Sequence, residues 1–504
     1  MRFALFFLSL VPLTRASSPD TFTPVHRLAG IGVARDDLTD DTIDARTRLM
    51  IDSQTFSILR EPMAVPGAKR ITTDKKLEQI FRSAAERSGL PVSLLEAIAY
   101  LESWGDAKAE SPAGPRGIMQ ISHGTAREMG LRVARTIKYR TVKEKVQVRD
   151  KHNKLVTRTV RRKVPYAVPG RDERLSPERA IPAAAMYLAN LERRYGGRDW
   201  AIFAYHCGEG CVSEMLDLTR RARGIPKDEV TVARMFFSAS PAWNRELYQA
   251  VQIQMQRDYS PTYWFRVRRA EQLLALYRED PDAFASLAKQ YRSDFGNAPR
   301  ASHRLAVWLK REDLVYHSGD DVRAAMGSKL VKAFDDPAYF GFALRIEPEE
   351  TDQNLEYMLQ ASPAAVGTLA YIAFETRRLF DEMNPKREHF IALPVTSLVE
   401  PEEYMVRNPK SEAPSHASGE VFDIAYAGLP PAENEALHFV LDDLGWDGYL
   451  GFVEEGRDNL HIGCAPSARE FFTSVYQDGL KSANKVKGQE GAQVSHDTHV
   501  SELH

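Results

Sequence analysis

Residues 90–131 read LPVSLLEAIAYLESWGDAKAESPAGPRGIMQISHGTAREMGL, and this stretch decides the fold of the first half of the chain. Pro91 starts a predicted helix, whose apolar face recurs at helical spacing through Leu94, Leu95, Ile98 and Leu101. Glu102 ends that apolar run. Because a carboxyl group among apolar side chains loses hydration when charged, its pKa is predicted to rise. Such an acid can protonate a leaving oxygen, although a lone Glu102 is better explained as an ordinary residue of a helix surface.

Short motifs follow this stretch in a fixed order and carry a resemblance to a known family. They are Glu102-Ser103, Ser111-Pro112-Ala113-Gly114, Gly117-Ile118-Met119-Gln120, the segment 175–188 (LSPERAIPAAAMYL) and Ala204-Tyr205-His206-Cys207-Gly208-Glu209-Gly210, with Tyr248 further on. Each motif is weak alone. Together, over about residues 76–255, they resemble the soluble, goose-lysozyme-like lytic transglycosylases.

The resemblance implies cleavage of the β-1,4 bond between N-acetylmuramic acid and N-acetylglucosamine in peptidoglycan, without a cofactor. Glu102 would protonate the glycosidic oxygen and then act as base on the muramic C6 hydroxyl, which closes a 1,6-anhydro ring. The substrate-binding residues implied are Ser111, Gln120, Tyr205 and Tyr248. Asp106 is a candidate second carboxylate, but an exposed loop position fits it better.

Two departures from the family pattern bear on substrate preference rather than on reaction type. His206 stands where the family has Asn, and a basic segment separates the motifs. Two alternatives also stay open. One is a goose-type muramidase, which hydrolyses the same bond, and the other is a non-catalytic cell-wall-binding protein.

A second group of residues lies near the end of the chain, where His416, Asp423 and His461 offer three metal ligands. Three protein ligands with an open fourth position suit a catalytic zinc, whose bound water becomes a nucleophile near neutral pH. Spacing alone argues against zinc, since a lone histidine is more often a hydrogen-bonded core residue.

Residues 385–470 resemble the zinc-binding D-alanyl-D-alanine carboxypeptidase and murein endopeptidase group. The resemblance rests on Pro394-Val395-Thr396-Ser397 and on the segment 415–424 (SHASGEVFDI). It implies zinc on His416, Asp423 and His461. The group's catalytic Glu is Asp458 here, with Glu455 nearby at a different spacing, and its Arg is replaced by Glu400. We therefore expect metal binding and leave hydrolysis open.

Between residues 132 and 163 lies a strongly basic segment, with 13 Lys and Arg against 2 Asp and Glu. Val, Thr and Ile recur there in near alternation, which predicts a β-hairpin inserted into a helical domain. Its charges either discourage pairing with other strands or contact an anionic polymer. We favour the first interpretation slightly.

The predicted organisation is multidomain. It comprises a signal peptide (1–16), a poorly regular lead-in (17–75), a mainly α, lysozyme-like catalytic domain (76–255) with the hairpin at 132–163, a helical connecting region (256–384), an α+β zinc-peptidase-like domain (385–482) and a disordered tail (483–504).

The start of the chain predicts export. A basic Met1-Arg2 precedes an apolar run at 3–13, and the small Ala16 follows. The run is too short to span a bilayer. The periplasm or another extracytoplasmic space is therefore the expected location, where Cys207 and Cys211 could form a disulfide or stay as buried thiols.

Composition limits the partners. The 504 residues carry 67 Lys and Arg against 69 Asp and Glu, a formal net charge of −2. This balance argues against a dedicated nucleic-acid-binding protein. Peptidoglycan is the expected partner, and no integral membrane span is expected.

Overall fold

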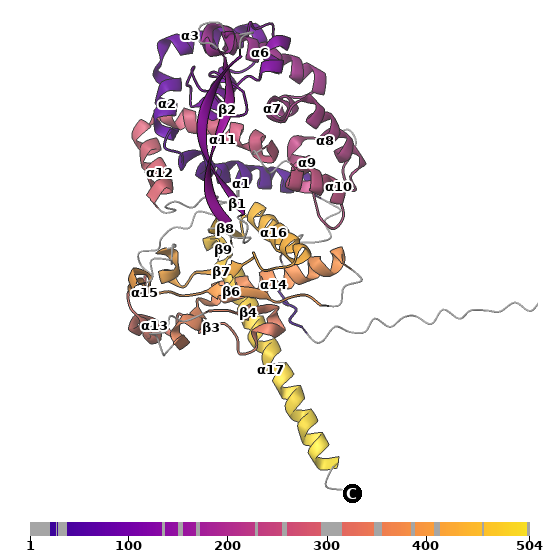
Figure 1. Cartoon of the computed structure of the whole chain (residues 1–504). Coiled ribbons are helices and arrows are strands. Elements are labelled where there is room, and N and C mark those ends of the chain that lie inside the picture. Colours follow the sequence, from indigo (N-terminus) through magenta and orange to yellow (C-terminus); the bar gives the residue numbers. More distant parts are fainter. Residues whose placement is uncertain are drawn as a thin grey trace, which may run out of the picture.

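The structure is a computed structural model (Figure 1), which describes residues 21–26, 28, 38–133, 137–149, 155–167, 172–226, 230–254, 260–293, 315–346, 355–384, 389–407, 414–455 and 458–500. A helical half reaches to Ser293, and a half built around a β-sheet begins at residue 315. Within these ranges, no helix combines the length and apolarity needed to cross a membrane. The predicted signal peptide lies outside them.

The helical half surrounds α4 (Val92–Ser103), the helix predicted from the first stretch. Its buried residues include Leu94, Leu95 and Ile98, and it packs against α3 and α11. The other helices of this half are α1 (Asp40–Leu59), α2 (Ala64–Thr73), α3 (Lys75–Ser88), α5 (His123–Glu128), α6 (Pro177–Tyr195), α7 (Arg198–Cys207), α8 (Glu209–Arg221), α9 (Val232–Ser238), α10 (Arg245–Tyr248), α11 (Tyr263–Glu279) and α12 (Pro281–Ser293).

The prediction of a poorly regular lead-in at 17–75 is wrong for α1 and α2. Helix α1 buries polar residues, among them Arg46 and Gln54, so its sequence lacks the apolar periodicity that marks an amphipathic helix. Helix α2 contains Pro66 and Gly67, which are usually helix breakers. Gly67 is needed there because a Cβ atom would lie 2.8 Å from the Cβ of Trp104.

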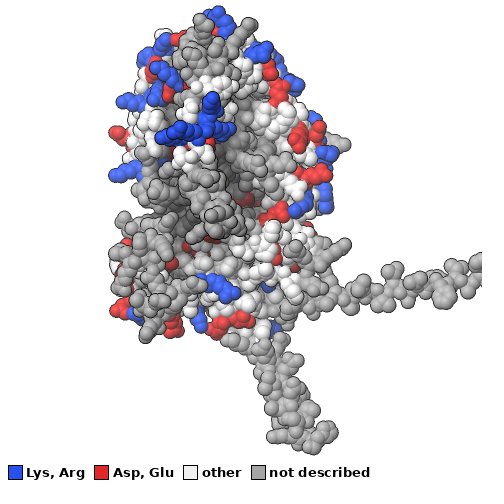
Figure 2. Space-filling view, in the orientation of Figure 1, with Lys and Arg blue, Asp and Glu red and all other residues white. Residues whose placement is uncertain are grey.

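The predicted basic hairpin is confirmed. Strands β1 (Ile137–Arg149) and β2 (Leu155–Ala167) pair antiparallel along their full length, in a sheet of their own. In the view of Figure 1 the hairpin runs as a long ribbon across the front of the helical half. Figure 2 shows Lys and Arg side chains gathered over it.

The predicted connecting region at 256–384 does not form a separate unit. Helix α11 packs on α4 and α1, and α12 packs on α11, so both complete the helical half. Residues from 315 onward belong to the sheet half, where β4 (Phe342–Leu344) pairs with β6 (Leu393–Ser397). The helical half thus extends past residue 255, the predicted end of the first domain, and the α+β half begins before residue 385.

The second half has a five-stranded sheet in the order β4-β6-β7-β9-β8. Strands β4 and β6 are parallel, and the other neighbours are antiparallel. Its other strands are β7 (Val421–Ala425), β8 (Leu450–Glu455) and β9 (Asn459–Cys464), and β3 (Val331–Lys332) pairs with β5 (Gln360–Ala361) apart from it. This half is α+β, as predicted; the helices are α13 (Gly319–Ala325), α14 (Pro363–Met383), α15 (Glu402–Arg407), α16 (Pro431–Trp446) and α17 (Arg469–Val500).

Helix α14 covers one face of this sheet. It packs against α16 and α17 and also contacts β7 and β9. At Gly367 the chain of α17 comes so close that a Cβ atom would lie 1.8 Å from Phe472 O. Helix α17 then continues to Val500 (Figure 1). The prediction of a disordered tail is therefore wrong up to that residue, since the segment follows an anchored helix and is rich in helix-forming Ala, Lys, Gln and Glu.

The two halves share an interface centred on a buried arginine. Arg46 of α1 donates to Asp443 and Asp447, both 2.8 Å away at the end of α16. Its guanidinium also lies 5.5 Å from the ring centre of Trp446. Charges buried this deeply are tolerated only when paired, so the contact fixes how the halves meet.

Candidate functional site

Glu102 is the next-to-last residue of α4 and is half-buried. Tyr263, the first residue of α11, donates its hydroxyl hydrogen to Glu102 Oε1 over 2.6 Å. Burial raises the pKa of Glu102 to about 7, although this hydrogen bond and the charge of Arg266 both lower it. Near neutral pH the group is divided between acid and carboxylate, which suits a residue that donates a proton and later takes one back.

The turn that follows α4 is tied to the end of that helix. Ser103 Oγ is 2.8 Å from Ile118 O, to which it donates a hydrogen bond. Gly117 has φ 77°, and a Cβ atom there would lie 1.8 Å from Arg174 O. Only glycine fits this position, because both the backbone conformation and the close approach exclude a side chain.

Gln120 lies in this turn, and Tyr205 contacts it from α7. Gln120 has φ 44°, and its Nε2 donates to Gly117 O over 2.9 Å. Tyr205 of α7 donates its hydroxyl hydrogen to Met119 O over 2.8 Å. Burial raises the pKa of Tyr205 well above its usual range, and the nearby charge of Glu102 raises it further. The structure therefore places Tyr205 close to Glu102 and in contact with the turn that carries Gln120.

Two other predicted positions lie in the loop between Glu102 and Gln120. Ser111 is half-buried, and its Oγ accepts a hydrogen bond from the backbone N–H of Ala113 over 3.2 Å. Its contact with sugar stays a prediction. Asp106 is exposed and caps its own turn by accepting from Lys108 N over 2.9 Å, in line with the expected loop position.

Tyr248, the last of the predicted substrate-binding residues, lies in a different part of the structure. It is buried at the interface between the halves, where its ring packs edge-on against Phe439 of α16 with centroids 5.8 Å apart. The tyrosine that reaches the carboxylate is Tyr263. Sequence reasoning missed it because the expected domain ended at residue 255. The useful signal was the aromatic start of the amphipathic helix at 263–279.

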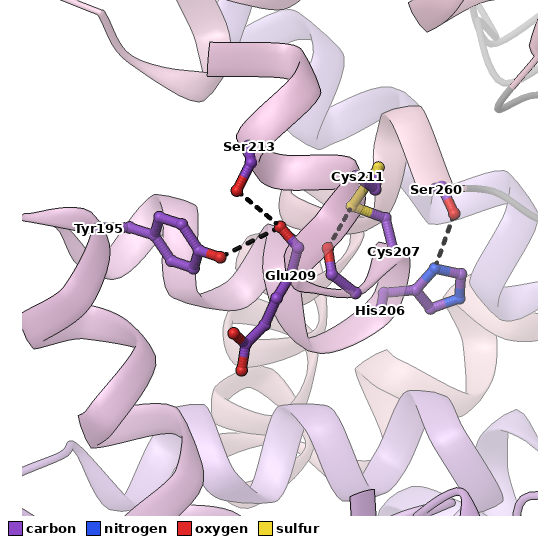
Figure 3. Close-up of a disulfide and its surroundings, with 8 residues drawn as sticks. Tyr195, His206, Cys207, Glu209, Cys211, Ser213 and Ser260 are labelled. Atoms are coloured by element: carbon purple, nitrogen blue, oxygen red, sulfur yellow. Dashed lines mark hydrogen bonds between the residues drawn. A yellow bond between two sulfur atoms is a disulfide. The ribbon is translucent and has the colours of Figure 1, made fainter. Parts of the chain in front are cut away.

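His206 packs against the ring of Tyr263. Its ring stacks on that of Tyr263 with centroids 4.3 Å apart, and its Nδ1 lies 3.0 Å from Ser260 Oγ. Figure 3 shows His206 directed toward Ser260, beside the disulfide between Cys207 and Cys211. Of the two states left open for these cysteines, the structure has the bridge, which closes the junction of α7 and α8.

The second predicted site is assembled in the sheet half. His416, Asp423 and His461 are buried, and one ligand atom of each lies within 4.8 Å of the others. Asp423 Oδ1 is 3.1 Å from His416 Nε2 and 2.9 Å from His461 Nδ1. Burial alone would lower the pKa of His416, but the charge of Asp423 raises it to about 10. Burial would raise the pKa of Asp423, yet the two histidines hold it well below its usual range.

The remaining ring nitrogens of the cluster have partners of their own. His416 Nδ1 lies 2.7 Å from Leu398 O, and His461 Nε2 lies 2.8 Å from Ser415 Oγ. Both rings are thus held with one nitrogen turned toward Asp423. The cluster is on the sheet face opposite α14, because Cys464 of β9 contacts Thr368 of α14 and side chains alternate along a strand.

Three carboxylates bear on this second site: the candidate bases Asp458 and Glu455, and Glu400 in place of the group's Arg. Asp458 is exposed and lies in the turn before β9, three residues before His461. The side chain of Glu455 lies outside the described residues. Glu400 is buried and accepts a hydrogen bond from Ser397 Oγ, so a carboxylate occupies the place where the resembling group has Arg.

Comparison with known proteins concerns the first site. Membrane-bound lytic murein transglycosylase F of Alcanivorax borkumensis is 29% identical over 178 residues, which are 34% of this chain and 30% of that protein. Peptidoglycan transglycosylase gp16 of Escherichia phage T7 is 33% identical over 132 residues, 26% of this chain and 8% of that protein. The chain spans less than a third of the length of these relatives. Residues 79–145 and 146–225 match the family model of the transglycosylase SLT domain, and Glu102, Gln120 and Tyr205 all lie inside that match.

Proposed function

We propose that this protein is a peptidoglycan lytic transglycosylase that cleaves between N-acetylmuramic acid and N-acetylglucosamine and leaves 1,6-anhydro ends. The observation that carries the proposal is Glu102, a carboxyl group whose pKa is about 7 and which accepts a hydrogen bond from Tyr263. The match to the SLT domain and the printed names of the relatives support the same reaction.

One carboxyl group can perform both proton transfers. Protonated Glu102 gives its proton to the glycosidic oxygen as the bond to muramic C1 breaks. The resulting carboxylate takes the proton of the muramic C6 hydroxyl, whose oxygen closes the ring on C1. Glycosidases of the usual type need two carboxylates at set distances, whereas Asp106 is exposed and used by its own turn. Tyr263 stabilises the carboxylate between the two steps.

The test is digestion of purified sacculi, with products identified by mass. Glu102→Gln should release no anhydro-muropeptides above background, because general acid–base help is typically worth about 10²–10⁴ in rate. Asp106→Asn is the matched control and should keep its activity. Products heavier by one water would mean hydrolysis instead. Binding of sacculi without any release by the native chain would leave a wall-binding protein.

We also propose that the protein acts outside the cytoplasm, where peptidoglycan lies. The apolar segment at 3–13 supports export. The disulfide between Cys207 and Cys211 fits an oxidising compartment. Protection of an epitope-tagged chain from added protease in spheroplasts would contradict this location.

We propose further that His416, Asp423 and His461 bind one zinc ion. Support comes from the convergence of one ligand atom of each and from the outer hydrogen bonds of both rings to Leu398 and Ser415. Metal-binding histidines usually make such outer contacts, which fix the tautomer and the ring orientation. Asp423 Oδ1 lies 3.1 Å from His416 Nε2 and 2.9 Å from His461 Nδ1. Ligand atoms about 3 Å apart suit a tetrahedral ion whose bonds are about 2.0–2.2 Å long.

We expect this zinc to be retained without efficient peptidase activity. Zinc-bound water needs a correctly placed base, and a shift of about 1 Å can cost on the order of 10²-fold. Asp458 is exposed in the turn before β9, and the buried Glu400 would repel a stem-peptide carboxylate.

Elemental analysis of the full chain tests the metal. One zinc per chain is expected, with loss in His416→Ala and retention in the control His317→Ala, which changes an exposed histidine paired with Glu402. Absence of zinc from the native chain, or unchanged zinc in His416→Ala, would overturn the site. Stem-peptide cleavage at an ordinary enzymatic rate would overturn the expected inactivity.

A further inference from the structure

The basic hairpin has two chemically different faces. In the observed register Lys143 lies directly opposite Arg161, and Thr141 lies directly opposite Lys163. Because side chains alternate along a strand, these four residues share one face with Tyr139. Among its described side chains the other face carries Val142, Val160 and Val164 together with Glu144 and Arg162, which lie 3.9 Å apart.

The basic face is the more exposed of the two, although Glu144 and Arg162 of the other face are exposed as well. Thr141, Lys143, Arg161 and Lys163 are exposed, whereas Val142, Val160 and Val164 of the other face are partly buried. Tyr139 is 63% exposed. None of the described side chains on the basic face is Asp or Glu.

This arrangement opposes the stability of the hairpin itself. Like charges directly opposite one another destabilise a strand pair, and an isolated two-stranded hairpin is marginally stable. Charged side chains protect a strand edge from pairing with other strands. A mixture of positive and negative charges would give the same protection without repulsion, and Arg162 with Glu144 is such a pair on the other face. Concentrated cations on the exposed face therefore indicate an anionic partner.

The hairpin is anchored on the wall of the proposed active site. Its ends are closed by Glu173, which accepts hydrogen bonds from Arg132 N and Nε over 2.7 and 2.9 Å. The next residue, Arg174, donates to Ile121 O over 3.1 Å, and its carbonyl oxygen packs against Gly117. Each 13-residue strand extends about 40 Å from that turn. The match to the SLT domain is interrupted between residues 145 and 146, inside β1.

We infer that the face formed by Tyr139, Thr141, Lys143, Arg161 and Lys163 binds the carboxylates of the stem peptides on the glycan strand that the active site cleaves. The inference rests on the proposed function. Residues 132–163 carry a net charge of +11 and the whole chain −2, so the rest of the chain carries −13. The hairpin thus offers attraction to an anionic polymer where the remainder repels it.

The binding experiment uses the full chain with Glu102→Gln, so that the polymer is not degraded during the measurement. Lys143→Gln, Arg161→Gln and Lys163→Gln are combined in one variant. The matched control combines Lys69→Gln, Lys289→Gln and Lys481→Gln, which removes the same charge from exposed positions elsewhere. The probes are intact sacculi and sacculi stripped of stem peptides by an amidase.

The hairpin variant should bind intact sacculi roughly tenfold more weakly at low ionic strength, since each exposed ion pair contributes a small factor. The difference should shrink as salt rises. The control should bind like the parent, and all three proteins should bind stripped sacculi equally. Melting temperatures within a few degrees of the parent's would exclude misfolding, which substitutions at exposed positions rarely cause.

Three results would overturn the inference. Equal binding of intact sacculi by the hairpin variant and the parent would leave only protection of a strand edge. An equal loss on stripped sacculi would mean that the face binds the glycan and not the peptides. A loss seen with vesicles of anionic lipid but not with sacculi would assign the face to a membrane. Release of soluble muropeptides by the Glu102→Gln chain during these measurements would reveal a wrong catalytic assignment of Glu102, separately from any result for the hairpin face.

Discussion

Replacement of Tyr263 by Phe isolates one hydrogen bond of the proposed acid. The Tyr263 hydroxyl donates to Glu102 Oε1 over 2.6 Å, and this bond lowers the pKa that burial raises. A hydrogen bond to a charged group is worth about 1.5–3 kcal/mol, and one pKa unit corresponds to about 1.4 kcal/mol. Loss of the bond should therefore raise the pKa of Glu102 from about 7 by about 1 to 2 units. Water that enters the vacated space would keep the shift near the lower value.

The assay is the pH dependence of kcat/KM for release of muropeptides. Glu102 must start protonated, so activity falls as pH rises through its pKa. Because a phenylalanine ring has no hydroxyl to stabilise the carboxylate, the alkaline limb of Tyr263→Phe should move to higher pH by about one unit. Tyr195→Phe is the control, since its hydroxyl donates to Glu209 O over 3.1 Å and away from the carboxylate. An unmoved limb, or one that moves to lower pH, would refute the reasoning.

Three further outcomes follow from the packing and are checked by thermal or denaturant unfolding. Arg46→Met should lower the free energy of unfolding by about 3–5 kcal/mol, because it removes the cation that pairs with the buried Asp443. The control Arg48→Met, at an exposed position, should change it by less than about 0.5 kcal/mol, and equal effects would contradict the interface. Gly117→Ala should be far more destabilising than Gly130→Ala, because both have positive φ but only Gly117 lacks space for a Cβ, so similar losses would count against the turn. Glu102→Gln should be more stable than the parent at alkaline pH by up to about 3 kcal/mol. The pKa of Glu102 rises from 4.5 to about 7 on folding, so the parent loses stability as pH rises between these values. Below pH 4.5 the difference between the two proteins should vanish.

Local pattern determined a good part of this protein. The apolar spacing of residues 94–101 predicts α4 and the position of Glu102 at its end, and alternation predicts the hairpin. These features could be predicted because a helix face or a strand face records in its own period that one side is buried. The resemblance of residues 385–470 implies a shared site for His416, Asp423 and His461, and the fold places their ligand atoms together.

Tertiary structure decided the partners of those faces. Tyr263 and not Tyr248 meets Glu102, because α11 folds back onto α4 while α10 packs against α16. Helix α1 could not be predicted from the sequence, because it buries Arg46 in ion pairs with residues about 400 positions away. The local spacing of apolar residues does not reveal such partners. The limits of both halves follow from the same kind of long-range contact. Local spacing states which side of an element avoids water, whereas the element that covers it is chosen by packing and charge across the whole chain.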